Sequence, residues 1–215
     1  MKYNTVIFDL DGTLLDTLED LTDSVNYALN KFGYPLRTLD EVRSFVGNGV
    51  KVLMNFSVPP GTSVEDTAEC LEIYRKYYTG NMQNKTRPYD GIYDLLKSLK
   101  EKGIKLAIVS NKYDSAVKAL CRDYYHEFIQ VAIGESQGVA KKPAPDSIYA
   151  AIEQLAANKE EVIYVGDSDV DVHTAHNAGL KCVGVTWGFR NREILQAEGA
   201  DFIIDKPEEL LGYLE

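Results

Sequence analysis

The sequence predicts an α/β protein: a Rossmann-like parallel sheet with helices on both faces, interrupted by an inserted all-helical cap domain. From about residue 88 onward, short apolar runs such as 104–109 and 162–165 alternate with segments of helical periodicity. Near-continuous apolar runs joined by helices are typical of buried parallel strands. Residues 16–85, by contrast, show helical patterns only. The two patterns together predict a sheet domain that carries a helical insertion.

The elements follow in order along the chain. Residues 5–8 form the first expected strand. Later strands are expected at 104–109, 128–133, 162–165, 182–185 and 202–204, with helices near 115–123 and 147–157, after 166, near 192–198, and at the end of the chain. We therefore predict a core of residues 1–15 and 86–215.

The inserted residues 16–85 are expected to form the cap. Apolar residues recur at helical spacing from 18 to 32. Thr38 and Glu41 form a capping box that opens a second helix, and Ser63 begins a third that runs to about residue 79.

Composition excludes several classes of function. The 215 residues carry a net charge of −10, which argues against nucleic-acid binding through a basic surface. The three cysteines form no metal-binding or disulfide pattern, as expected in a reducing compartment. No apolar stretch reaches the roughly 18 residues of a membrane span. We expect a cytoplasmic protein without membrane or nucleic-acid partners.

Polar residues follow three of the predicted strands. Asp9 and Asp11 come after the first strand, Ser110 and Asn111 after the strand at 104–109, and Asp167 after the strand at 162–165. The carboxyl ends of parallel strands open onto one crevice, so these side chains are expected to converge.

Five carboxylates would then share two short loops: Asp9, Asp11, Asp167, Asp169 and Asp171. Such a group repels itself strongly at low dielectric, and a hard divalent cation such as Mg²⁺ resolves the repulsion. Helix capping is the alternative explanation for one or two of them, Asp169 in particular.

With a metal and a phosphate in place, the N-terminal acids can divide the chemistry. Asp9 is suited to attack phosphorus and Asp11 to handle the proton of the leaving oxygen. Thr13 can orient this loop by hydrogen bonding. Phosphoryl transfer also needs hydrogen-bond donors and a fixed cation, for which Ser110 and one lysine of the pair at 141–142 are candidates.

Four segments carry a resemblance to a known family. Residues 8–17 (FDLDGTLLDT), 110–112 (SNK), 142–146 (KPAPD) and 166–171 (GDSDVD) resemble the four motifs of the haloacid dehalogenase-like hydrolase superfamily, in the family's order and spacing. The resemblance covers nearly the whole core. It implies a phosphatase that acts on a small phosphoester and forms an aspartyl-phosphate.

The resemblance also implies roles for individual residues. Asp9 would be the nucleophile, Asp11 the acid and base, and Lys142 the phosphate-stabilising lysine, with Ser110 and Asn111 on the substrate phosphate. Mg²⁺ would be held by three residues, namely Asp9, the main-chain carbonyl of Asp11, and Asp167. Asp171 would support Lys142 or metal-bound water, and Asp169 has no role in the pattern.

The insertion suggests a branch of the superfamily. Residues 45–50 (FVGNGV) and 186–190 (TWGFR) are similar to segments of phosphoglycolate phosphatases, and Gly47, Asn48 and Gly49 would then contact the substrate. A plain turn between helices is the alternative for these three residues.

Several alternatives share part of the pattern. A β-phosphoglucomutase-like enzyme, a pyrophosphatase or a nucleotidase would carry the same four motifs. A haloalkanoic acid dehalogenase needs neither Mg²⁺ nor Asp11, and a phosphorylated signalling domain would lack the helical insertion. The full set of acids together with Lys142 favours the phosphatase.

Overall fold

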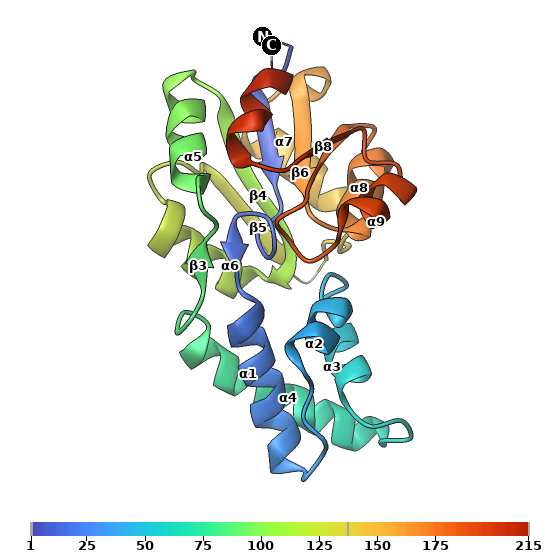
Figure 1. The fold of residues 1–215 in the computed structure, drawn as a ribbon. Coiled ribbons are helices and arrows are strands. Elements are labelled where there is room, and N and C mark those ends of the chain that lie inside the picture. The colour runs from blue at the N-terminus through green and yellow to red at the C-terminus, as the bar shows by residue number, and fades with distance from the viewer. Residues whose placement is uncertain (1, 137, 215) are drawn as a thin grey trace. The chain divides into compact units, whose positions relative to one another are not determined.

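The chain divides into two compact units. The computed structural model describes residues 2–136 and 138–214, and one unit combines Met1–Leu15 with Pro88–Glu215, whereas the other is formed by Asp16–Arg87. The first unit contains the main sheet and the second is helical, as the ribbon drawing shows (Figure 1).

The sheet unit is built on six parallel strands in the order β5-β4-β1-β6-β7-β8. Its strands are β1 (Thr5–Phe8), β4 (Lys105–Tyr113), β5 (Val131–Glu135), β6 (Val162–Gly166), β7 (Lys181–Val185) and β8 (Phe202–Ile204). The central strand β1 is buried along its whole length. Burial on both faces is why the strands read as unbroken apolar runs.

Helices cover the sheet. They are α5 (Ile92–Glu101), α6 (Asp114–Leu120), α7 (Asp146–Gln154), α8 (Asp169–Asn177) and α9 (Arg192–Ala197), with a π-helical turn at Cys121–Tyr125 and 3₁₀ helices at Lys159–Glu161 and Pro207–Tyr213. Ile7 of β1 packs in one cluster with Ile148 of α7 and Val172 of α8. Its neighbours Val6 and Phe8 are equally buried and, by strand alternation, point to the opposite face. Both faces of the sheet are therefore covered, as predicted.

The helical unit contains α1 (Leu18–Lys31), α2 (Leu39–Phe45), α3 (Val50–Ser57) and α4 (Val64–Asn81). Thr38 and Glu41 form the predicted capping box, and Ser63 caps α4 by accepting a hydrogen bond from the Asp66 main chain. The buried carboxylate of Asp20 accepts hydrogen bonds from the main-chain N–H groups of Lys85 and Thr86. This contact ties the returning chain to α1.

Several predicted elements differ from the observed ones. The second predicted helix ends at Phe45, and the glycine-containing turn at 46–49, the alternative considered for Gly47, Asn48 and Gly49, separates α2 from α3. The last predicted helix is present as the 3₁₀ helix at Pro207–Tyr213. β4 extends to Tyr113 instead of ending at 109, and β5 begins at Val131 rather than at 128. Two short strands, β2 (Leu15–Asp16) and β3 (Arg87–Pro88), pair with each other and had no apolar run to reveal them.

Within the described residues, no helix combines the length and the apolar character that crossing a membrane requires.

Candidate active site

The loop after β1 presents the first two acids. Asp9 directly follows Phe8, and its main-chain N–H donates to the carbonyl of Val165 on β6 at 2.9 Å. Gly12 has a φ of 88°, and a Cβ at this position would lie 2.3 Å from Oδ2 of Asp167. Only glycine permits both this backbone conformation and the close approach of the two loops.

Three buried carboxylates meet at the carboxyl ends of β1 and β6. Asp9, Asp167 and Asp171 each offer an oxygen within 4.8 Å of the other two, and all three are buried. Asp9 and Asp167 follow their strands directly, whereas Asp171 lies in the first turn of α8. The predicted convergence of the strand-end acids is thus observed for Asp9 and Asp167.

Lys142 lies between two of these acids. Its ammonium nitrogen Nζ is 2.9 Å from Oδ1 of Asp9 and 2.7 Å from Oδ1 of Asp171, and the side chain is 3% exposed. The geometry decides between the two lysines of the 141–142 pair, because Lys142 is the one that is buried against the acids. A buried cation of this kind offsets part of the local negative charge.

Asp171 both caps α8 and holds Lys142. Its Oδ2 accepts hydrogen bonds from the hydroxyl of Ser168 at 2.6 Å and from the main-chain N–H groups of Asp167 and Ser168 at 3.2 and 3.1 Å. Ser168 is the N-cap of α8, so the capping role considered for Asp169 is wrong. Asp169 instead accepts a hydrogen bond from Arg190. Asp171 therefore contacts Lys142 through Oδ1 and the start of α8 through Oδ2, and it holds the Lys142 ammonium group in place.

The hydroxyl group of Tyr164 completes this network, and the sequence analysis did not identify it. The hydroxyl accepts from Nζ of Lys142 at 3.1 Å and donates to Oδ1 of Asp171 at 2.9 Å. Tyr164 is fully buried on β6. A tyrosine in an apolar strand is ordinarily read as core, so the only sequence signal was its position three residues before Asp167.

We expect Tyr164→Phe to lower the free energy of unfolding by about 1–3 kcal/mol, because Lys142 and Asp171 each lose a buried partner. Turnover should fall several-fold, through loss of Lys142 positioning. Tyr125→Phe is the matched control: its buried hydroxyl donates to the carbonyl of Leu14 at 2.8 Å. Urea melts and initial rates of both variants check this, and equal turnover in both would contradict a role for Tyr164 in positioning Lys142.

Asp167 is fixed by contacts from two further loops. Oδ1 accepts from the hydroxyl of Thr13 at 3.1 Å, and Oδ2 accepts from the main-chain N–H of Phe189 at 2.7 Å. Gly188 allows this approach, because a Cβ there would lie 2.3 Å from Cβ of Asp167. Trp187 donates from Nε1 to the carbonyl of Thr13 at 3.0 Å, which ties the 186–190 segment to the first loop.

The cluster is electrostatically stressed. Burial, followed by the nearby carboxylate of Asp171, raises the pKa of Asp9 to about 7, although Lys142 opposes the shift. Burial and then Asp171 and Asp9 also raise the pKa of Asp167 well above its ordinary range. Burial alone would lower the pKa of Lys142, but Asp171 and Asp9 more than compensate, so its pKa is raised and the ammonium stays charged. These shifts indicate a site that favours an additional positive charge.

Ser110 and Asn111 lie inside β4, not after it as expected. The pairing register between β4 and β5 shifts between Val109 and Tyr113, so the strand is irregular around these two residues. The side chain of Asn111 accepts from the main-chain N–H of Lys142 at 2.8 Å and donates to its carbonyl at 3.0 Å. Asn111 therefore holds the backbone of Lys142, next to the cis Lys142–Pro143 bond. Ser110 accepts from the main-chain N–H of Lys112.

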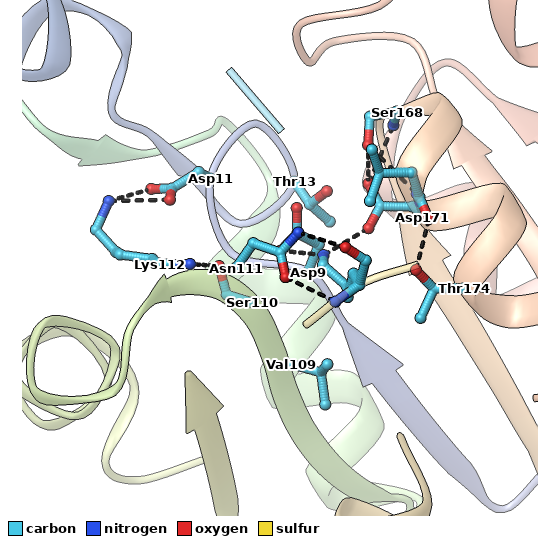
Figure 2. A network of polar contacts seen from close by, with 12 residues as sticks. Asp9, Asp11, Thr13, Val109, Ser110, Asn111, Lys112, Ser168, Asp171 and Thr174 are labelled. Atoms are coloured by element: carbon cyan, nitrogen blue, oxygen red, sulfur yellow. Dashed lines mark hydrogen bonds and ion pairs between the residues drawn. The ribbon is translucent and has the colours of Figure 1, made fainter. Parts of the chain in front are cut away.

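Asp11 forms an ion pair that the sequence analysis missed. Nζ of Lys112 lies 2.7 and 2.9 Å from the two carboxylate oxygens of Asp11, and the side chains are only 5% and 13% exposed. Figure 2 shows this pair on one side of Asp9, with Ser168 and Asp171 on the other. Lys112 belongs to the segment 110–112 that resembles a family motif. Asp11 lies 101 positions away in the sequence, so no sequence pattern pointed to a contact between the two residues.

The remaining predicted site residues belong to the other unit. Gly47, Asn48 and Gly49 lie in the turn between α2 and α3, and the two glycines have φ values of 127° and 84°. They therefore occupy a turn between helices, and their contact with a substrate stays a prediction.

Comparison with known proteins agrees with the fold and identifies the family. The family model for haloacid dehalogenase-like hydrolases matches residues 6–185. Phosphoglycolate phosphatase 1 of Pseudomonas aeruginosa is 31% identical, over 96% of this chain and 78% of its own length. Pyrophosphatase PpaX of Bacillus mycoides is 32% identical, over 100% of this chain and 98% of its own.

A solved structure is similar over the full length. The crystal structure of a candidate phosphoglycolate phosphatase from Lactobacillus delbrueckii subsp. bulgaricus has a TM-score of 0.94 and 35% identity, and the match covers 100% of this chain and 99% of that one. The family model alone spans far more than half of the chain. The chain therefore belongs to the haloacid dehalogenase-like hydrolases, in the branch that includes enzymes similar to phosphoglycolate phosphatases.

Proposed function

We propose that this chain is a Mg²⁺-dependent phosphatase that hydrolyses a small organic phosphoester through an aspartyl-phosphate on Asp9. The observation that carries the proposal is the buried group of Asp9, Asp167 and Asp171 with Lys142 inserted between two of its members. A purely structural cluster has no need for neighbouring carboxylates that, together with burial, raise the pKa values of Asp9 and Asp167.

The donor set fits a hard divalent cation. The candidate ligands are all oxygens, from the carboxylates of Asp9 and Asp167 and the main-chain carbonyl of Asp11, and Mg²⁺ prefers such ligands. Thr13 and Phe189 orient Asp167 for this role. A bound Mg²⁺ would neutralise the acids and draw charge from the phosphoryl oxygens.

The residues of the chain then perform a two-step transfer. A carboxylate oxygen of Asp9 attacks phosphorus, the bond from phosphorus to the leaving oxygen breaks, and Asp11 gives its proton to that oxygen. In the second step Asp11 takes a proton from water, the water oxygen attacks phosphorus, and the bond to Asp9 breaks to release phosphate. Lys142 and Ser110 stabilise the charge of the phosphoryl oxygens during both steps.

We further propose that the helical unit, residues 16–87, serves as a cap that excludes water from the site. Gly47, Asn48 and Gly49 would present main-chain and amide groups to the substrate. The positive φ of both glycines supports this, because backbone without a side chain can approach a ligand closely.

Pyrophosphate is a second candidate substrate. The similarity to pyrophosphatase PpaX covers 100% of this chain at 32% identity, as extensive as the similarity to phosphoglycolate phosphatases. In both candidate substrates the phosphoryl group is attached to a small leaving group. The proposed roles of Asp9 and Asp11 are therefore the same for each.

Purified protein with Mg²⁺ is expected to release phosphate from 2-phosphoglycolate, pyrophosphate or p-nitrophenyl phosphate, and EDTA should reduce the rate to background until excess Mg²⁺ restores it. A malachite-green assay across a panel of small phosphoesters measures this. Undiminished release in EDTA would rule out the metal requirement. A product that is an isomeric sugar phosphate, with no free phosphate, would identify a mutase instead.

A further inference from the structure

The site contains two lysines whose side chains are almost fully covered, and the two have different partners. Lys142 lies among Asp9, Asp171 and Tyr164, on the side of the nucleophile. Lys112 lies in the part of β4 where the pairing register with β5 shifts, and its ammonium group contacts both carboxylate oxygens of Asp11. In Figure 2 the Lys112–Asp11 pair lies apart from the network around Asp171. One cation is therefore associated with the transferred phosphoryl group, and the other with the residue proposed to serve the leaving oxygen.

The contact of Lys112 with Asp11 cannot stay unchanged during catalysis. Both oxygens of Asp11 are within 2.9 Å of the ammonium group in this structure. If Asp11 hydrogen-bonds to a leaving oxygen, the carboxyl oxygen that does so is no longer available to Lys112 alone, and the ion pair weakens. The side chain of Lys112 is 5% exposed, so bulk water does little to stabilise its charge when this ion pair weakens. A negative group on the substrate, close to the leaving oxygen, would replace the lost contact.

We propose that Lys112 binds an anionic group on the leaving part of the substrate, so that the enzyme selects phosphoesters whose leaving group is itself negatively charged. This inference rests on the proposed function and specifies its substrate class. The chemistry required is a compact oxyanion one or two atoms beyond the leaving oxygen, and both a carboxylate and a second phosphate satisfy it. Lysine suits either, because its ammonium acts as a point charge without a fixed geometry.

A matched set of substrates tests the inference. 2-Phosphoglycolate carries a carboxylate, pyrophosphate carries a second phosphate, and 2-hydroxyethyl phosphate has the size of the first but a neutral leaving group. In Lys112→Met, kcat/KM for the two anionic substrates should fall by roughly 10- to 100-fold relative to 2-hydroxyethyl phosphate, mostly through KM. Lys112→Arg should restore most of the selectivity because it keeps the charge.

Two further variants complete the design. Lys118→Met removes an exposed lysine of α6 that pairs with Asp114, and its selectivity should equal that of the wild type. Lys112→Gln keeps a hydrogen-bond donor without the charge. It replaces Lys112→Met in the selectivity test if the methionine variant fails to fold. Circular dichroism melts establish that each variant is folded before its rates are compared.

The outcomes separate the inference from the proposed function. Equal losses on all three substrates would overturn the inference and show that Lys112 only positions Asp11. Rates equal to those of the wild type on all three substrates would overturn it as well. A loss confined to 2-phosphoglycolate or to pyrophosphate supports it and identifies the oxyanion as carboxylate or phosphate. A wild-type enzyme inactive on all three substrates would overturn the proposed function together with the inference.

Discussion

Asp9→Asn is expected to abolish turnover, with a loss on the order of 10⁴-fold or more in kcat. The amide cannot attack phosphorus, and no other carboxylate occupies its position at the end of β1. Phosphate release in the presence of Mg²⁺ measures the effect. Activity within a few-fold of the wild type would refute Asp9 as the nucleophile.

The same substitution should stabilise the metal-free protein above pH 7. The pKa of Asp9 is raised from its ordinary 3.8 to about 7, chiefly by burial and then by Asp171. The folded state therefore binds the proton more tightly than the unfolded chain. The stability that Asp9 contributes is full below about pH 3.8 and is lost as the pH rises through about 7. Asn carries no charge to bury, so it avoids this loss.

Thermal melts in EDTA at pH 5 and pH 8 check this second expectation. The advantage of Asp9→Asn over the wild type should grow from pH 5 to pH 8. Added Mg²⁺ should raise the melting temperature of the wild type more than that of the variant, because a ligand that binds only the folded state stabilises it in proportion to its affinity. A variant less stable than the wild type at pH 8 in EDTA would show that the contact between Lys142 and Asp9 outweighs the burial of charge.

Lys142→Met should have the second largest effect. It removes the cation that lies 2.9 Å from Asp9 and 2.7 Å from Asp171, and the acids then repel one another without compensation. We expect kcat to fall by about 10³-fold, the size typical for loss of a group that stabilises transition-state charge. At pH 8 in EDTA the free energy of unfolding should fall by roughly 3–5 kcal/mol, as for a broken buried ion pair.

Lys141→Met is the control for this prediction. Lys141 is the adjacent residue and is only partly buried, so its loss should change turnover by less than about three-fold. Initial rates and urea melts of the two variants are compared directly. If Lys141→Met proved as damaging as Lys142→Met, the assignment of the phosphate-stabilising cation to Lys142 would have to be abandoned.

The sequence by itself determined the fold class and the principal acids. Strands buried on both faces leave unbroken apolar runs, so β1, β4 and β6 were visible without a structure. The residues that follow such strands must share one edge of a parallel sheet, which is why Asp9 and Asp167 could be placed together. Capping is equally local, and Thr38 with Glu41 was identified because a capping box spans only four consecutive residues.

Only the tertiary structure decided how those acids are supported. The contacts that fix the site join residues distant in the chain, such as Thr13 with Asp167 and Asn111 with the backbone of Lys142. The contact between Lys112 and Asp11 joins β4 to the loop after β1, and the register shift in the same stretch of β4 leaves no periodic signal in the sequence. A spacing rule describes neighbours along a helix or strand, whereas these contacts depend on how separate loops pack at the edge of the sheet.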